Sequence, residues 1–345
     1  MWFRRIAVVA ASTVLAVAAG TAGAQAAINR QWRIVYHVNL KLPNYWWPGA
    51  LAAPSRDQAW ALGYTLKGGR ISGDILEHWN GRRWRMTAVP GINLMPVAVA
   101  ASSPDNVWLF SSANRAFRWD GQRWTRAPGT KGMPMGGGVV LGPSNVWTAG
   151  GTFCDASTLY HWTGSRWFTH ALPGAVVGIS GSSAKNFWVL TQQETVTSTC
   201  RPEPGVPLRA YRWDGSSFKR MRIPRIVNQH GLGGRLVVSS PSNIWIANII
   251  DSPIMHWNGH RWSRLNKPPF DIAPAGIVPD GHGGAWIGGC WHWSAGTWYE
   301  IYAADACDET FGLVRIPRTM SAWRLGIATI GGRVESTIEV NGRLP

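Results

Sequence analysis

Acidic residues are scarce in this sequence of 345 residues. Asp and Glu together number 18, against 34 Lys and Arg, so the formal net charge is +16. Lysine is also scarce, with 6 residues, so arginine carries nearly all of the positive charge. A field of this sign attracts polyanions. Because the arginines are spread along the chain rather than gathered in one segment, the pattern does not favour nucleic acid as the partner.

Long apolar segments are missing after the N-terminus, and no segment repeats its apolar residues with the 3.6-residue period of a helix. We therefore expect no transmembrane helix, which would need about 20 apolar residues. Glycine and proline are abundant by contrast, with 40 and 22 residues. Many turn residues without a helical period predict an all-β protein.

The first 26 residues have the three-part pattern of a secretory signal peptide. The pair Arg4-Arg5 precedes an apolar run over residues 6–19, and small residues follow, ending in Ala24-Gln25-Ala26. The apolar run is too short to span a bilayer as a helix. We therefore predict cleavage near Ala26, secretion of the chain, and a single domain over residues 27–345.

Tryptophan occurs 23 times and follows a repeat. One tryptophan of each repeat lies in a short apolar run after a turn. Seven such residues occur 37 to 57 positions apart: Trp60, Trp108, Trp147, Trp188, Trp245, Trp286 and Trp323. This spacing is typical of the four-stranded blade of a β-propeller. Further along the repeat, a pair of aromatic residues flanks a turn, as in Trp119-Asp-Gly-Gln-Arg-Trp124. Asn-Gly and Asp-Gly turns of this kind predict β-hairpins.

The seventh repeat ends before its fourth strand, because the sequence stops at Pro345. The segment Asn29–Arg33 matches the start of the fourth strand in the other repeats. We therefore predict a seven-bladed β-propeller of four-stranded blades. The N-terminal strand should complete the last blade and close the ring. The second repeat predicts its four strands over residues 96–101, 106–111, 116–119 and 122–127.

The repeats resemble those of known propeller families. The segment Asp280-Gly-His-Gly-Gly-Ala-Trp286-Ile-Gly-Gly resembles the repeat of two-component-regulator propellers. The Trp-Asp-Gly hairpins resemble those of kelch and sialidase-type propellers, although the sialidase motif places one residue between Asp and Gly. This resemblance implies the fold and carries over no catalytic residue. Because propellers include enzymes, lectins and scaffolds, it leaves the function open.

Four cysteines in a secreted chain predict disulfides. In an up-and-down blade, the loop between the second and third strands lies on the same face as the loop to the next blade. All four cysteines fall in loops of these two kinds, and we predict the pairs Cys154–Cys200 and Cys290–Cys307. We call the face that carries them the cysteine face. Their spacing lacks the Cys-x-x-Cys pattern of zinc sites.

Three tryptophans after the N-terminal segment fall outside the repeat. Trp46 and Trp47 follow Tyr45 in the predicted loop that enters blade one, and Trp291 follows Cys290. All should lie on the cysteine face. Exposed aromatic rings there would suit stacking on sugar rings, because a flat apolar ring fits the C–H face of a sugar. The alternative is that these rings pack under the loops or plug the channel.

The one acidic cluster, Asp305, Asp308 and Glu309, should lie on the same face. A glycosidase needs two carboxylates that face each other across a bond, and calcium needs several oxygen ligands. The alternative is solvated loop charge. The sequence contains no serine-hydrolase elbow, phosphate loop or zinc-protease helix. These observations favour a non-enzymatic chain without a cofactor, with calcium kept as a possibility.

Histidine precedes the third-strand tryptophan in four repeats, at His78, His161, His256 and His292. Equivalent positions in different blades cannot converge on one ion, so we predict a structural role and no metal site. The fourth strands carry several arginines, which would discourage pairing of an exposed edge with another chain. The alternative is a basic rim that touches anionic polymers. The arginines are Arg82, Arg83, Arg85, Arg123, Arg126, Arg166, Arg261 and Arg264.

The preferred functional hypothesis is a secreted, non-enzymatic binding module. It would recognise extracellular carbohydrate, a cell-wall polymer or a protein through the cysteine face. Two alternatives stay open: a propeller glycosidase or polysaccharide lyase that uses the acids of that face, and a protein-interaction scaffold.

Overall fold

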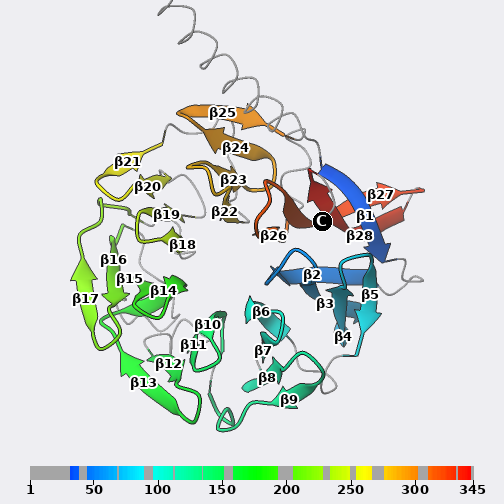
Figure 1. The fold of residues 1–345 in the computed structure, drawn as a ribbon, viewed down its shortest axis with the longest axis horizontal. Coiled ribbons are helices and arrows are strands. Elements are labelled where there is room, and N and C mark those ends of the chain that lie inside the picture. The colour runs from blue at the N-terminus through cyan, green and yellow to red at the C-terminus, as the bar shows by residue number, and fades with distance from the viewer. Residues whose placement is uncertain are drawn as a thin grey trace, which may run out of the picture.

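The computed structural model describes residues 32–38, 45–67, 70–88, 96–111, 113–133, 135–150, 158–192, 205–227, 234–248, 254–265, 276–301, 310–331 and 333–342. These residues form seven antiparallel sheets of four strands each. The sheets follow one another around a ring, one sheet per blade (Figure 1). The predicted all-β, seven-bladed propeller is therefore confirmed. The predicted signal peptide over residues 1–26 lies outside the described residues.

Blades one to three each consist of four consecutive strands, which follow one another from the ring axis outward. Blade one contains β2 (Tyr45–Ala52), β3 (Ala59–Lys67), β4 (Arg70–Trp79) and β5 (Trp84–Thr87). Blade two contains β6 (Pro96–Ser103), β7 (Asn106–Ser111), β8 (Arg115–Trp119) and β9 (Trp124–Arg126). Blade three contains β10 (Gly138–Gly142), β11 (Asn145–Ala149), β12 (Thr158–Trp162) and β13 (Trp167–Ala171).

Blades four to six repeat the same order. Blade four contains β14 (Ala175–Ser183), β15 (Asn186–Gln192), β16 (Leu208–Trp213) and β17 (Phe218–Met221). Blade five contains β18 (Gly234–Ser240), β19 (Asn243–Asn248), β20 (Met255–Trp257) and β21 (Trp262–Arg264). Blade six contains β22 (Ile277–Pro279), β23 (Ala285–Ile287), β24 (Trp291–Ser294) and β25 (Thr297–Glu300).

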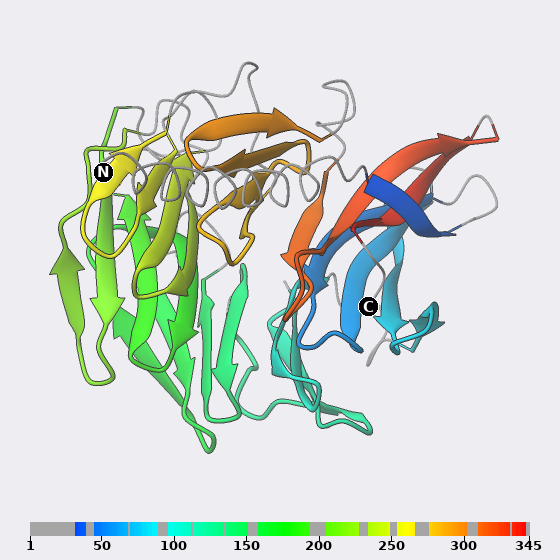
Figure 2. The ribbon, with the colours of Figure 1, turned by 45° about the horizontal axis from the view of Figure 1, so that its top comes forward.

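Blade seven joins the two ends of the described chain. Its inner strands are β26 (Gly312–Arg315), β27 (Ala322–Ile330) and β28 (Arg333–Asn341), and its outermost strand is β1 (Trp32–Val38). β1 runs antiparallel to β28, with Trp32 opposite Asn341 and Val38 opposite Ser336. Figure 2 shows the blue strand β1 lying across the red strands of this blade. The predicted closure of the ring by the N-terminal strand is confirmed.

The hairpin between the third and fourth strands is built by a side chain that folds back on its own turn. In blade two, Asp120 Oδ1 accepts hydrogen bonds from the backbone N–H groups of Gln122 and Arg123, at 2.9 and 2.8 Å. Gly121, which follows Asp120 in the turn, has φ of 96°, a conformation that glycine adopts without steric cost. Asn80, Asp214 and Asn258 accept the same two kinds of hydrogen bond in their own blades.

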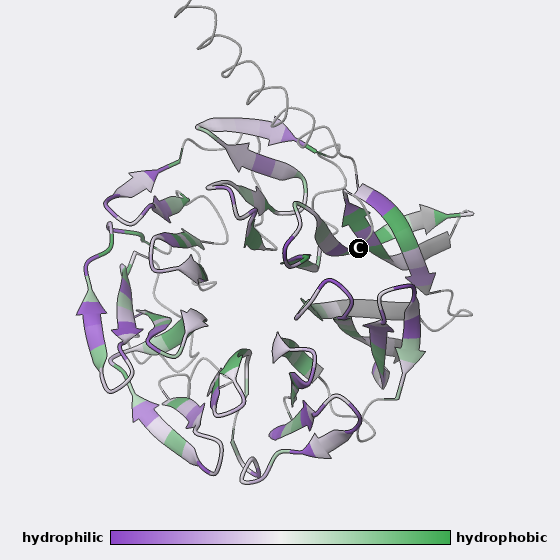
Figure 3. Ribbon diagram, viewed as in Figure 1, coloured by the Kyte–Doolittle hydropathy of each residue, from purple (hydrophilic) through white to green (hydrophobic). Residues whose placement is uncertain are grey.

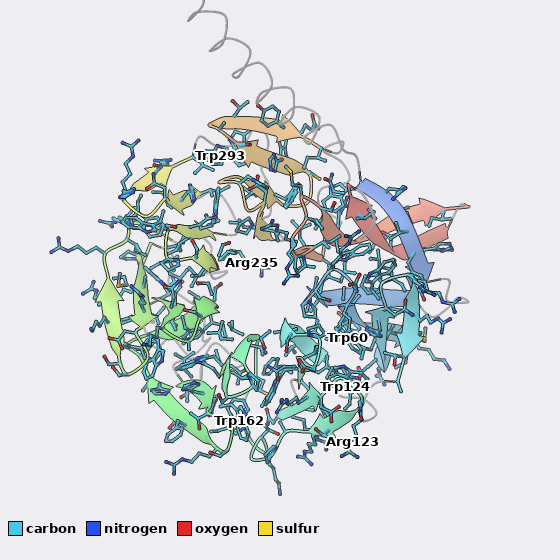
Figure 4. All side chains as sticks on the ribbon, viewed as in Figure 1. Trp60, Arg123, Trp124, Trp162, Arg235 and Trp293 are labelled. Carbon is cyan, nitrogen blue, oxygen red and sulfur yellow. The ribbon has the colours of Figure 1, made fainter. Side chains whose placement is uncertain are left out.

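Neighbouring blades meet through the tryptophan of the second strand, which packs against the hairpin aromatics of the next blade. Trp60 of blade one lies with its ring centroid 5.4 Å from that of Trp119. Its centroid lies 5.3 Å from that of Trp124, and Figure 4 labels these two residues. Trp323 of blade seven repeats this contact with Trp79 and Trp84 of blade one, at 5.3 Å each. The same seam therefore crosses the point of closure. Burial of these large rings supplies much of the apolar packing between blades.

Asparagine fixes the orientation of this tryptophan in four consecutive blades. The residue two positions before the tryptophan accepts a hydrogen bond from the indole Nε1 through its side-chain Oδ1. The four distances are 3.1, 2.7, 2.9 and 2.7 Å, for Asn106–Trp108, Asn145–Trp147, Asn186–Trp188 and Asn243–Trp245. A buried indole N–H is thereby satisfied at each of these seams.

Candidate functional site

The aromatic triplet Tyr45–Trp47 lies at the start of the innermost strand of blade one. β2 begins at Tyr45, which pairs with Leu66 at the far end of β3. The prediction that these residues belong to a loop is therefore wrong, because their backbone joins the sheet. Because consecutive strands of a blade run in opposite directions, the start of β2 lies at the same end of the ring as the loops between second and third strands. Cys290 lies in such a loop, between β23 and β24. The triplet thus lies on the cysteine face, in the strand nearest the axis.

Trp291 is buried, whereas a residue that stacks on a sugar would have to be exposed. It begins β24 and has 3% of its surface exposed. Its indole packs edge-on against Trp298, with ring centroids 6.5 Å apart, and Cys290 belongs to the same buried cluster. The placement of Trp291 in a loop is wrong. The ring faces the interior, as in the alternative in which it packs under the loops.

The remaining candidates of the cysteine face lie outside the described residues. They are the acidic cluster Asp305, Asp308 and Glu309, and the cysteines Cys154, Cys200 and Cys307. The two disulfide pairs and the acidic site, including its possible use for calcium, therefore stay predictions. Cys290 itself is fully buried. Thr310, which follows the acidic cluster, is buried as well.

The third-strand histidines pack on the second-strand tryptophans. His161 lies parallel to Trp147 with ring centroids 3.8 Å apart, and His256 lies 4.0 Å from Trp245. His256 Nε2 also lies 3.0 Å from Asn243 Oδ1, so one asparagine oxygen contacts both rings. Among the residues that the structure describes, no group of three His, Cys, Asp or Glu side chains could hold a metal ion. These histidine rings therefore form part of the packing of the blades.

Asp280 and His292 form a buried pair in blade six. His292 Nε2 lies 2.9 Å from Asp280 Oδ2, and the backbone N–H groups of His282 and Gly284 donate to Asp280 Oδ1. Burial alone would raise the pKa of Asp280, but these hydrogen bonds outweigh it and hold the pKa below its usual value. The pair closes the turn between β22 and β23, at the end of the ring away from the cysteine face.

A buried ion pair that no sequence motif predicted lies where blade six meets blade seven. Arg324 Nη1 lies 3.4 Å from Glu339 Oε2, and the two side chains are 1% and 3% exposed. Thr337 Oγ1 donates to Glu339 Oε1 at 2.8 Å, and the guanidinium lies 5.9 Å from the ring of Trp32. These contacts tie β27 and β28 to the closing strand β1. The sequence signal was a charged residue inside an apolar run, in Trp323-Arg324-Leu325.

A second unpredicted pair lies at the junction of blades seven and one. Tyr36 of β1 donates its hydroxyl to Glu77 Oε1 of β4 at 3.1 Å. Glu77 is fully buried, and its Oε2 has no hydrogen-bond partner among the described residues. Burial raises the pKa of Glu77 to about 7. Burial and the charge of Glu77 raise the pKa of Tyr36 to about 12. The pair therefore links ring closure to the protonation of one carboxyl group.

Membrane crossing by a helix has no support in the described part of the chain, where no helix reaches the length and hydrophobicity that it requires.

Comparison with known proteins identifies the fold class. No family model matches the chain. No curated protein matches it either. Among solved structures, a catalytically inactive virginiamycin B lyase from Staphylococcus aureus, with quinupristin, has a TM-score of 0.60 and 13% identity. That match covers 91% of this chain and 100% of the other.

Two further solved structures are similar over a comparable length. YCF48 bound to D1 peptide has a TM-score of 0.55 and 12% identity, over 90% of this chain and 96% of that one. The WD40 propeller domain of Doa1 has a TM-score of 0.53 and 11% identity, over 90% and 97%. At these identities the similarity establishes the β-propeller fold alone.

Proposed function

We propose that this protein is a secreted, non-enzymatic binding module that recognises carbohydrate at a cell surface through the cysteine face. The observation that carries the proposal is the position of Tyr45, Trp46 and Trp47. Three consecutive aromatic residues stand at the start of β2, the strand of blade one nearest the axis (Figure 1). Loops held by a rigid scaffold over the mouth of a ring are a common place for ligand binding.

The rigid scaffold itself supports a binding role. Each blade is locked to the next by a buried tryptophan, and the ring is closed by β1. Such a frame fixes the positions of the strand ends that border the face, and a preorganised site lowers the entropic cost of binding. Aromatic side chains suit sugar binding, because the flat apolar face of an aromatic ring can stack on the C–H face of a sugar.

Secretion is part of the proposal and rests on the N-terminal pattern of Arg4-Arg5, the apolar run 6–19 and Ala24-Gln25-Ala26. N-terminal sequencing of the protein recovered from the culture medium tests it. A mature N-terminus near Ala27 is the expected result. Retention of the intact N-terminus in the cell fraction would contradict it.

Binding is tested with the purified secreted protein on a panel of glycans and cell-wall polymers, at low and high salt. We expect binding that survives high salt, because stacking does not depend on charge. The variants Trp46→Ala and Trp47→Ala should lose it. Phe168→Ala is the matched control, since Phe168 is an exposed aromatic of the outermost strand β13.

A protein or peptide partner is the second candidate function. YCF48, which shares the fold, has been determined with a bound peptide. If no glycan binds and the same aromatic variants abolish capture of a peptide from a library, the cysteine face serves a protein partner instead. Turnover of a glycan in the same assay, lost in Asp308→Asn or Glu309→Gln, would favour the glycosidase or lyase alternative.

A further inference from the structure

The described residues of blades three to five carry almost no negative charge. Their described residues (138–150, 158–192, 205–227, 234–248 and 254–265) include one acidic side chain, Asp214. That carboxylate is paired with Lys219 Nζ at 2.8 Å and accepts hydrogen bonds from its own turn. The same described residues include 11 basic side chains: Arg166, Lys185, Arg209, Arg212, Lys219, Arg220, Arg222, Arg225, Arg235, Arg261 and Arg264.

Six exposed members of this set lie on the turns and outermost strands of the three blades. Lys219 is one of them and pairs with Asp214, and we call the other five the basic sector. They are Arg166, Lys185, Arg220, Arg261 and Arg264. The outermost strands β13 and β17 carry the hydrophilic colour of Figure 3 at the rim of the ring. The sector therefore faces solvent across consecutive blades, away from the start of β2.

Arg166 and Arg261 occupy the same position in their blades, directly before the outermost strand. The turn residues beside them are Thr163 and Asn258, which are uncharged. The neighbouring turns of the same blades approach through Ser144 and Ser242, which are uncharged as well. Blade two differs, because Asp120 Oδ2 lies 3.9 Å from Arg123 Nε at the equivalent position. The charges of Arg166 and Arg261 are thus left without an acid among the described residues of these turns.

The remaining members extend the sector between these two turns. Lys185 lies in the turn between β14 and β15 and packs over Gly215 of the blade-four hairpin. Arg220 lies in β17, two residues after Phe218, and Arg264 lies at the equivalent position in β21, two residues after Trp262. The guanidinium of Arg166 lies 4.4 Å from the ring centroid of Phe168, a contact that orients the cation and leaves it exposed.

Edge protection does not account for the sign of this charge. A charged side chain of either sign discourages an exposed strand from pairing with another chain. Glu300 provides an acidic example, because it is exposed on β25, the outermost strand of blade six. The excess of positive over negative side chains among the described residues of three consecutive blades needs a different explanation, and attraction of an extended polyanion provides one.

We propose that the basic sector binds a linear polymer that repeats phosphate or sulfate groups. Guanidinium groups match these oxyanions with two parallel hydrogen bonds. The cations are distributed over three blades, so a small anion would contact one or two of them, whereas a chain could contact several in succession. Successive contacts on one chain strengthen binding because later contacts form at a high effective concentration.

The test compares two triple variants that remove the same charge from opposite sides of the ring. The sector variant is Arg166→Ser/Arg261→Ser/Arg264→Ser. The matched control is Arg82→Ser/Arg83→Ser/Arg85→Ser in blade one, which faces blades four and five across the ring (Figure 1). The probes are long-chain inorganic polyphosphate and dextran sulfate, with neutral dextran, monomeric phosphate and duplex DNA for comparison. Both variants are first checked for an unchanged unfolding temperature.

We expect the full chain to bind both charged polymers, with neutral dextran and monomeric phosphate at least about a hundredfold weaker. The sector variant should lose roughly tenfold or more in affinity, and the blade-one control roughly twofold or less. Binding should weaken steeply as salt rises. Polyphosphate binding without dextran sulfate binding would assign the phosphate polymer, and the reverse would assign the sulfate polymer.

Equal losses in the two variants would overturn the proposal, because overall charge would then explain the binding. Tighter binding of duplex DNA than of either polymer, at an equal concentration of negative charge, would also overturn it. The variant Trp46→Ala should leave polyanion binding unchanged. Its result separates this inference from the aromatic site on the cysteine face, so either one can fail alone.

Discussion

The imidazole of His161 lies flat on the indole of Trp147, with ring centroids 3.8 Å apart and an interplanar angle of 5°. The pairs His78–Trp60 and His256–Trp245 repeat this stacking at 4.0 Å each. Burial, and to a smaller extent the proximity of His170, lowers the pKa of His161 to about 4. Burial also lowers the pKa of His78 and of His256. Burial in these stacks therefore favours the neutral form of the three histidines.

His161 makes the protein sensitive to acid. Its pKa lies below the ordinary value of 6.5, so the unfolded chain takes up the proton first. The stabilising effect is present above about pH 6.5 and is lost as the pH falls toward 4. Urea unfolding across this range should show the free energy of unfolding decreasing. His161→Gln should reduce that slope, whereas His260→Gln, in an exposed turn, should not; identical slopes in both variants would contradict the assignment.

Glu77 should make the protein less stable as the pH rises, which is the opposite of the effect of His161. Its pKa rises from 4.5 to about 7 on folding, so the folded protein holds the proton more tightly than the unfolded chain. The stabilisation is full below about pH 4.5 and is lost as the pH rises through about 7, a change of roughly 3 kcal/mol. Glu77→Gln should abolish this contribution. The difference in free energy of unfolding between variant and parent isolates it from the histidines.

The matched variant for Glu77 is Tyr36→Phe. It removes the hydroxyl that donates to Glu77 and that lowers the pKa of the carboxyl group. The midpoint of the pH effect should therefore move to higher pH. A midpoint that stays in place would show that the hydroxyl does not interact with the carboxylate in solution.

The asparagine that accepts the indole hydrogen bond should contribute measurably to stability. Asn186→Ala leaves the Nε1–H of the buried Trp188 without its acceptor. The expected loss in free energy of unfolding is about 1–3 kcal/mol. Ser182→Ala removes the exposed hydroxyl on the other side of the same asparagine and should cost less than about 0.5 kcal/mol. A comparable loss in both would argue that the hydrogen bond between Asn186 and Ser182, rather than the one from Trp188, accounts for the stabilisation.

Ring closure should require β1. A chain that lacks Trp32–Val38 would expose β28, where Ile338 and Val340 are fully buried and pack in the core of blades seven and one. An exposed apolar edge strand pairs with other chains. We expect such a chain to bind a hydrophobic dye and to aggregate in size-exclusion chromatography. Arg33→Ser, an exposed position on the same strand, should remain monodisperse; a soluble, cooperative truncated chain would show that β1 is dispensable.

The sequence predicted the fold because the repeat is carried by residues whose chemistry the fold requires. The spacing of Trp60, Trp108 and the other second-strand tryptophans follows the blade period, and Asp120-Gly121 defines a hairpin turn. The matching segment around Trp32 predicted closure because it has the same turn-then-tryptophan pattern. The predicted bounds of the four strands of blade two differ from the observed bounds by at most two residues.

The candidate site was predicted less well, because it depends on contacts between strands that no local pattern encodes. Trp291 follows a cysteine and looks like a loop residue, but it begins a strand and is buried beside Trp298. Glu77 and Arg324 lie in strand sequences whose partners, Tyr36 and Glu339, come from other strands. Such pairs can be recognised only as charged residues inside apolar runs.

The pairing of β1 with β28 also determines when folding can finish. Val38 and Ser336 come from opposite ends of the described chain, so their contact closes nearly the longest loop available. During synthesis β1 emerges before the other described strands, whereas its partner β28 emerges after them. Blades one to six can assemble from neighbouring segments, while β1 must wait without a sheet of its own. The segment that completes the ring is therefore the one exposed longest to proteases and chaperones.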